Sequence, residues 1–143
     1  MATFTATGAQ ATVQPKGLRV GLVAVRSIYS IANTLSAGDV FQMVKVPANA
    51  TPMFVEFGGT NATPSFLMKA GDDITPARYR SLATYSAGVG MVLANANLAT
   101  VTPPYTYTAD NTLDIELSTI TASNASSGGA FYMNVIFSMD PGV

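Results

Sequence analysis

The sequence predicts an all-β fold: a single-domain β-sandwich of jelly-roll-like topology, preceded by an extended N-terminal arm. Short apolar segments alternate with polar residues at a period of two, which is the spacing of side chains on one face of a strand. Turn-forming residues separate these segments about every 8–12 positions. The result is about eight short strands, the number that a jelly roll normally contains.

The chain has 143 residues, which suits one domain with a buried core. Residues 1–17 are small and polar, and they include Gly8, Pro15 and Gly17. We therefore expect residues 1–17 to form the arm and residues 18–143 to form the sandwich. The arm could add a strand to the sheet edge of a neighbouring subunit, or it could be a frayed terminus.

Each strand is predicted from its alternation and from the residues that end it. In the strand at 40–46, Val44 and Val46 should share a face with Val40, and Pro47 should end the strand. The segment 18–24 alternates in the same way, and Gly58 with Gly59 should end the strand before them. In chain order, the expected strands are 18–24, 26–32, 40–46, 53–57, 65–69, 105–108, 112–120 and 130–139.

The clearest alternation lies in the last third of the chain. Leu113, Ile115 and Leu117 should point into the core, whereas Asp114 and Glu116 should face solvent or a partner subunit. The last strand should line one face with five apolar side chains: Phe131, Met133, Val135, Phe137 and Met139.

One short helix is expected at residues 75–82. Thr75 is a suitable N-cap, and Pro76 suits the first helical position because its missing N–H would have no partner there. The segment is long enough for about two turns.

The composition excludes several classes of function. The chain has no Cys and no His, so it lacks thiolate metal ligands, disulfides and the commonest general base. Only 10% of the residues are charged, against about 25% in an average soluble domain. A surface with so little charge is poorly protected against association, which indicates that other protein covers part of it.

Basic residues are few and scattered, and the formal net charge is −1, so nucleic-acid binding is not expected. The first residues lack the features of a signal peptide, and no apolar stretch approaches the ~20 residues of a membrane span. The sequence therefore predicts synthesis in the cytoplasm and no membrane partner.

Three groups of residues have side chains that could carry chemistry. Gly71, Asp72 and Asp73 could bind a hard cation, although an ordinary turn explains them better. Asp114 and Glu116 share a strand face, as a catalytic carboxylate pair might, but their alternation with core residues favours an external position. We predict no catalytic residue, no cofactor and no metal.

Aromatic side chains give a third group. Tyr105 and Tyr107 share a strand face and could stack on a sugar, together with Tyr79 and Tyr85. Packing or a subunit contact is the simpler interpretation. The expected interface residues are drawn from the arm, the basic pair and these tyrosines: Phe4, Gln14, Pro15, Lys16, Arg78, Arg80, Tyr105 and Tyr107.

Several stretches together resemble small structural proteins of tailed bacteriophages, many of which are head decoration or cement proteins. They are Gly17-Leu-Arg-Val-Gly-Leu22, Tyr29-Ser30, Thr34-Leu-Ser-Ala-Gly-Asp-Val40, Met43-Val-Lys-Val-Pro47, Tyr107-Thr-Ala-Asp-Asn-Thr-Leu-Asp114 and Val135-Ile-Phe-Ser-Met-Asp140. The resemblance spans most of residues 17–140, but residues 58–104 do not fully match the Asp-rich centre of such proteins. It brings no catalytic residues.

This resemblance implies a non-enzymatic virion protein on the outer capsid surface that stabilises the head. Its implied partners are the major capsid protein and further copies of itself, as a homotrimer. The alternative is a receptor- or carbohydrate-binding module of a head fibre or tail. A wall-degrading enzyme is disfavoured because His, Cys and a convergent carboxylate pair are missing.

Overall fold

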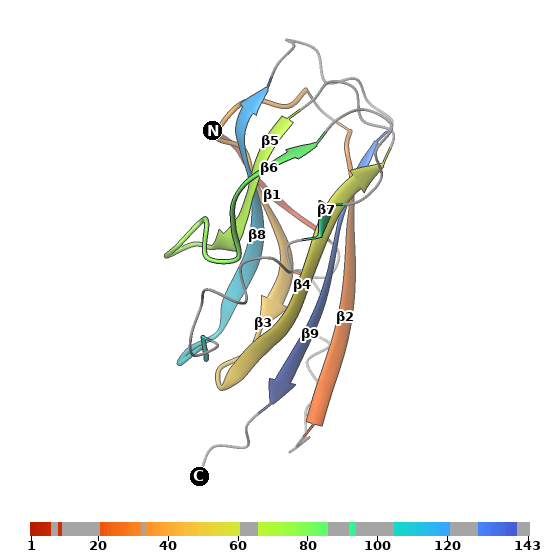
Figure 1. The fold of residues 1–143 in the computed structure, drawn as a ribbon. Coiled ribbons are helices and arrows are strands. Elements are labelled where there is room, and N and C mark those ends of the chain that lie inside the picture. The colour runs from red at the N-terminus through yellow and green to blue at the C-terminus, as the bar shows by residue number, and fades with distance from the viewer. Residues whose placement is uncertain are drawn as a thin grey trace.

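A computed structural model of the chain describes residues 1–6, 9, 21–32, 34–60, 66–85, 92–93, 105–120 and 129–139. Within these ranges the chain forms two β-sheets that face each other, so the predicted β-sandwich is confirmed (Figure 1). The strands are β1 (Thr3–Thr5), β2 (Gly21–Ser30), β3 (Val40–Val46), β4 (Ala50–Thr60), β5 (Phe66–Asp72), β6 (Arg80–Tyr85), β7 (Val92–Leu93), β8 (Asn111–Ile120) and β9 (Ala130–Met139).

The two sheets have the strand orders β1-β3-β8-β5-β6 and β2-β9-β4-β7. Among the strands β2 to β9, the first in the chain pairs with the last, the second with the second last, and so on inward. The pairs are β2 with β9, β3 with β8, β4 with β7, and β5 with β6. All four pairs are antiparallel. A long antiparallel ribbon that is rolled up gives this nesting, so the pairing is consistent with a jelly-roll-like topology.

The core lies between the two sheets and consists mainly of aromatic, Met and aliphatic side chains. Each inner face supplies every second residue of its strands, as the pleat requires. The predicted inward positions on β8 and β9 are confirmed, with Met139 only partly buried at its strand end. The largest fully buried side chains are Phe41, Phe57, Phe131, Phe137, Met43, Met68, Leu113, Ile115, Leu117 and Met133.

Bulges change the alternation in places that the sequence did not reveal. In β3 the pairing with β8 shifts between Gln42 and Val44, and the extra residue is Met43. Val44 and Val46 are buried as predicted, but Phe41 rather than Val40 joins them in the core. A second bulge, between Pro52 and Phe54, lies in β4.

Some predicted strand limits were wrong. The expected strands at 18–24 and 26–32 are parts of one strand, β2. The strand β4 does not end before Gly58 and Gly59 but continues through them, and it also includes Pro52. Pro52 is tolerated because it lies beside a bulge, where the regular ladder is already interrupted. Residues 105–107 are not a strand, although the Tyr107 N–H donates to the Ala50 carbonyl at 3.0 Å.

The expected helix at residues 75–82 is also wrong. The Arg78 N–H donates to the Thr75 carbonyl at 3.0 Å, which closes one tight turn. The next N–H, of Tyr79, donates instead to the Ala70 carbonyl at 2.9 Å, and this bond returns the chain to the sheet as β6. The Asp72 side chain accepts from the N–H groups of Ile74 and Thr75, so it takes the place of a helical N-cap.

The described part of the predicted arm packs on its own sheet. β1 pairs with β3 in parallel, and the Phe4 ring stacks on Phe41 with centroids 5.0 Å apart. Asp39 adds a polar tie, because its Oδ1 accepts from the Ala2 N–H at 2.8 Å. The predicted boundary at residue 17 lies outside the described residues, and contact of the arm with a neighbouring subunit stays a prediction.

Candidate interaction surfaces

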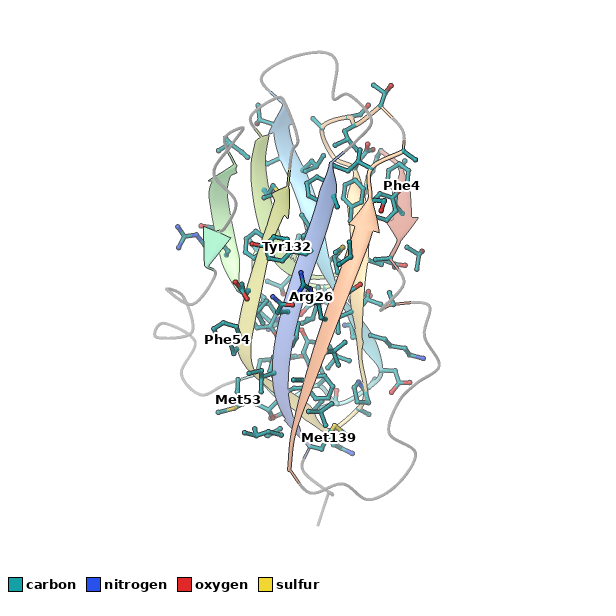
Figure 2. All side chains as sticks on the ribbon, turned by 90° about the vertical axis from the view of Figure 1, so that its right-hand side faces the viewer. Phe4, Arg26, Met53, Phe54, Tyr132 and Met139 are labelled. Carbon is teal, nitrogen blue, oxygen red and sulfur yellow. The ribbon has the colours of Figure 1, made fainter. Side chains whose placement is uncertain are left out.

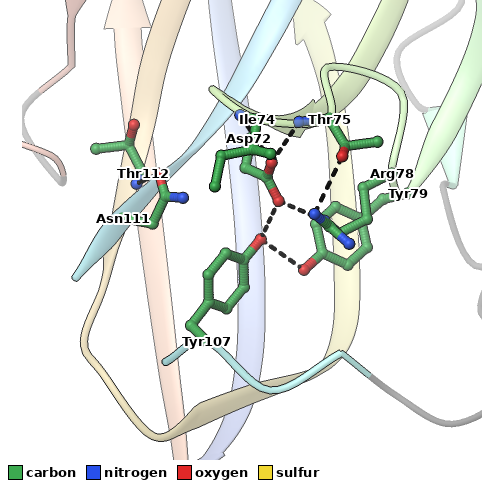
Figure 3. Close-up of polar contacts among 8 residues, drawn as sticks. All are labelled: Asp72, Ile74, Thr75, Arg78, Tyr79, Tyr107, Asn111 and Thr112. Atoms are coloured by element: carbon green, nitrogen blue, oxygen red, sulfur yellow. Dashed lines mark hydrogen bonds and ion pairs between the residues drawn. The ribbon is translucent and has the colours of Figure 1, made fainter. Parts of the chain in front are cut away.

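A buried carboxylate organises one end of the sandwich (Figure 3). Asp72 closes β5, and its side chain has no exposure to solvent. Its Oδ1 accepts from the N–H groups of Ile74 and Thr75 at 3.1 and 2.7 Å, and its Oδ2 accepts from Arg78 Nε and from the Tyr107 hydroxyl. Four donors therefore meet at this one carboxylate, three from the turn after β5 and one from the segment before β8.

The two buried tyrosines of this cluster act as fixed hydrogen-bond donors. Burial raises the pKa of Tyr107 far above its usual range, with Tyr79 and Asp72 adding to the effect. Burial also raises the pKa of Tyr79 to about 12. The Tyr107 proton is committed to Asp72 at 2.7 Å, so Tyr79 donates across the 2.9 Å contact between the two hydroxyls.

Arg78 and Tyr105 close the cluster toward solvent. The Arg78 guanidinium carbon lies 3.7 Å from the centre of the Tyr105 ring, and that ring meets Tyr107 edge-on at a centroid distance of 4.9 Å. Burial lowers the pKa of Arg78, but its hydrogen bond to Asp72 and the Asp72 charge more than offset this, and the net pKa is raised. The polar groups of this cluster therefore bind one another and hold the turn after β5 to the segment before β8.

Asp114 was predicted to face solvent or a partner, but only 6% of its surface is exposed. It pairs in register with Gly71 on β5, and the backbone of Thr75 and Pro76 lies directly over Gly71. The turn therefore covers this part of the outer face of the five-stranded sheet. Asp114 Oδ1 has no hydrogen-bond partner among the described atoms, and burial raises the pKa of this carboxyl to about 7.

Replacing Gly71 with Ala is expected to lower the unfolding free energy by about 3 kcal/mol or more. A Cβ at this position would lie 2.2 Å from the Thr75 carbonyl oxygen and 2.4 Å from the Pro76 carbonyl carbon, and a backbone cannot yield as a flexible side chain does. Urea unfolding measures the loss, with the exposed Ser81→Ala on β6 as the control. Equal stability of Gly71→Ala and the wild-type protein would contradict this packing.

The outer face of the four-stranded sheet carries a large apolar surface. Figure 2 looks onto this face, where Tyr132 lies above Arg26, and Phe54 and Met53 lie below it and to its left. Leu22 and Ile28 on β2 are 71% and 44% exposed, and Met53 on β4 is 49% exposed. The sequence prediction correctly grouped Leu22 with Ala24 on one face, and the structure shows that this face points outward while Val23 and Val25 line the interior.

One polar row crosses this face between two apolar rows. Arg26, Asn134 and Glu56 pair in register across β2, β9 and β4. Asn134 Nδ2 donates to Glu56 Oε2 at 2.8 Å, whereas Arg26 makes no hydrogen bond or ion pair with any residue in the described ranges. The row on one side holds Ala24, Ile136 and Phe54, and the row on the other holds Ile28, Tyr132 and Gly58.

The predicted interface residues do not form one surface. Phe4 belongs to an aromatic cluster with Tyr29 and Phe41, and Arg78, Tyr105 and Tyr107 belong to the Asp72 cluster. Arg80 begins β6 opposite Ala70, while Gln14, Pro15 and Lys16 lie outside the described residues. The sequence prediction did not name the outer face of the four-stranded sheet. Apolar residues at both the odd and the even positions of β2 are the signal that could have indicated it.

Two of the four tyrosines of the carbohydrate-binding alternative are not accessible for stacking. Tyr79 and Tyr107 are buried at 3% and 2% exposure, and Arg78 covers a face of Tyr105. In the described ranges no three His, Cys, Asp or Glu residues are grouped so that they could hold a metal ion. The same ranges contain no helix long and apolar enough to cross a membrane.

The fold has similar solved structures in phage particles. A chain in the capsid of Ralstonia phage GP4 matches with a TM-score of 0.73 and 14% identity, over 96% of this chain and 98% of that one. A chain in the capsid asymmetric unit of cyanophage Pam1 matches with a TM-score of 0.58 and 18% identity, over 92% and 96%. No protein-family model and no curated protein sequence matches the chain.

These likenesses extend over nearly the whole of each chain, so the sandwich is shared as one unit rather than as a fragment. At 14–18% identity they establish a common fold. They support the single-domain all-β sandwich that the sequence pattern predicts.

Proposed function

We propose that this chain is a non-enzymatic structural protein of a phage particle, and specifically a decoration protein that binds the outer capsid surface and stabilises the head. The observation that carries the proposal is the end-to-end match of its fold to a chain in the capsid of Ralstonia phage GP4. In this proposal its partners are the major capsid protein and two further copies of itself.

The surface chemistry supports this role. Only 10% of the residues are charged, and in the described ranges several large apolar side chains face outward on one sheet. Such surfaces lose little solvation energy when another protein covers them. Repetition over a symmetric shell then converts weak single contacts into firm attachment.

The contacts within the Asp72 cluster support a structural role for its charged and tyrosine side chains. Asp72 accepts from both Arg78 and Tyr107, so these three residues bind one another within the fold. The arrangement locks the turn before β6 to the segment before β8. The alternative of a sugar-binding head-fibre or tail module loses its main support because two of its four tyrosines are buried.

Copy number in purified particles tests the proposal. A decoration protein should occur on the order of hundreds of copies per head, because the shell repeats its binding position by symmetry. Quantitative mass spectrometry against the major capsid protein gives this ratio. Purified protein should also rebind to heads that lack it and raise the temperature at which they open. A handful of copies per particle, or its absence from particles, would contradict the proposal.

A further inference from the structure

We propose that the outer face of the β2-β9-β4-β7 sheet is the contact between copies of this chain, related by rotation about an axis parallel to the strands. In this contact Arg26 of one copy pairs with Glu56 of the next. The inference rests on the self-association included in the proposed function, and it assigns the surface and the charge pair that carry it.

The exposed apolar side chains of this face favour contact with another protein surface. Leu22, Ile28, Met53 and Ile136 supply four of the six large apolar side chains that are exposed in the described ranges. They lie on three adjacent strands, in apolar rows on either side of the polar row of Arg26, Asn134 and Glu56. Apolar side chains gathered on one face in this way mark interaction sites on soluble proteins.

The shape of the face suits a close contact. Tyr132 is only 8% exposed although it points outward, because its ring lies over the space left open by Gly58. A Cβ at Gly58 would lie 2.7 Å from the Tyr132 hydroxyl oxygen. The aromatic side chain is therefore held flat against the sheet and does not project from it.

The charge pattern of the face is complementary to itself. Its polar row has the Arg26 cation on β2, and the Glu56 carboxylate lies two strands away on β4. Neighbouring strands are about 4.8 Å apart, so the two backbones are separated by about 10 Å with Asn134 between them. Arg26 is left with no partner in the described part of its own chain, and a second copy supplies one.

The position of the charges selects the rotation axis. Rotation about an axis parallel to the strands keeps the rows level, so the Arg26 end of one row meets the Glu56 end of the next. This holds for two copies and for three. Rotation about an axis across the strands would instead bring Arg26 against Arg26 and Glu56 against Glu56, which is unfavourable. Because Arg26 and Glu56 lie in one row, a second copy of this chain can pair with both charges, and we take it as the partner that binds this face.

Charge reversal with rescue tests this contact. Light-scattering mass and sedimentation are measured for the wild-type chain, Arg26→Glu, Glu56→Arg and the double variant. The wild-type protein should have the mass of three chains. Each single reversal should weaken association at least tenfold, because like charges then face each other at every contact. The double variant should recover the wild-type mass, because the pair is restored with its signs exchanged.

Lys45→Glu is the control, because it reverses a partly exposed cation on the other sheet, away from this face. It should leave the mass unchanged, and circular dichroism should show that all variants fold. A wild-type monomer at every concentration, or single reversals that associate as the wild type does, would overturn the inference. Full association without binding to heads would reject the proposed capsid role alone. Binding to heads as a monomer would reject this contact alone.

Discussion

Asp72→Asn is expected to lower the unfolding free energy by about 3–5 kcal/mol, since it removes one partner of a buried ion pair and leaves the other in place. The variant keeps the volume of the side chain. It places an amide where four donors converge, so the Arg78 guanidinium and the Tyr107 hydroxyl lose their charged acceptor. Urea unfolding at constant pH measures the change.

Asp110→Asn provides the comparison for this variant. Asp110 pairs with Lys45 at 3.7 Å, and the two side chains are 55% and 38% exposed, so its loss should change stability by about 0–1 kcal/mol. Similar small losses in both variants would mean that the Asp72 cluster does not hold the turn to the sandwich. A cooperative loss in Asp72→Asn alone supports the buried network.

Asp114→Asn is expected to stabilise the protein above pH 7, by about 2–4 kcal/mol at pH 8. The pKa of this carboxyl is 3.8 in a free chain and about 7 in the fold, because burial disfavours its charged form. Between these values the folded state keeps a proton that the unfolded state releases. The wild-type stability therefore falls as the pH rises from about 4 to 7 and stays low above that. The amide cannot ionise, so the variant avoids this loss.

Unfolding curves at pH 4, 6 and 8 test this dependence. The two proteins should differ little at pH 4 and should diverge as the pH rises. Asp110→Asn again serves as the control, because its carboxylate is half exposed and its ion pair is long. A constant difference between Asp114→Asn and the wild-type chain at all three pH values would show that Asp114 does not carry the pH dependence.

The sequence predicted the sandwich well where alternation is uninterrupted. On β8 and β9 the apolar series that begin at Leu113 and at Phe131 lie on the inner face, because the pleat alone decides their direction. The prediction failed at Val40, since the bulge at Met43 shifts the phase of β3 by one residue. A bulge adds a residue without changing composition, so a periodic pattern cannot reveal it.

The buried polar cluster could not be predicted, because its members come together only in the folded chain. Asp72 and Tyr107 are 35 positions apart in sequence, and the burial of Asp114 depends on a turn that packs over Gly71. The expected helix failed for the same reason. Thr75 and Pro76 are suitable local helix signals, but the Tyr79 N–H finds a stronger partner in β5. Tertiary contacts override local preference at these positions.

The nested strand order also has a consequence for the route by which the chain reaches its fold. β9 lies between β2 and β4 in its sheet, yet it follows both of them in the chain by a long interval. Synthesis therefore delivers the two flanking strands well before the strand that joins them. The sheet can close only after β9 has left the ribosome, so β2 and β4 are synthesised before their shared partner is available. Most of the strand pairs bridge distant segments, and such non-local topologies fold slowly.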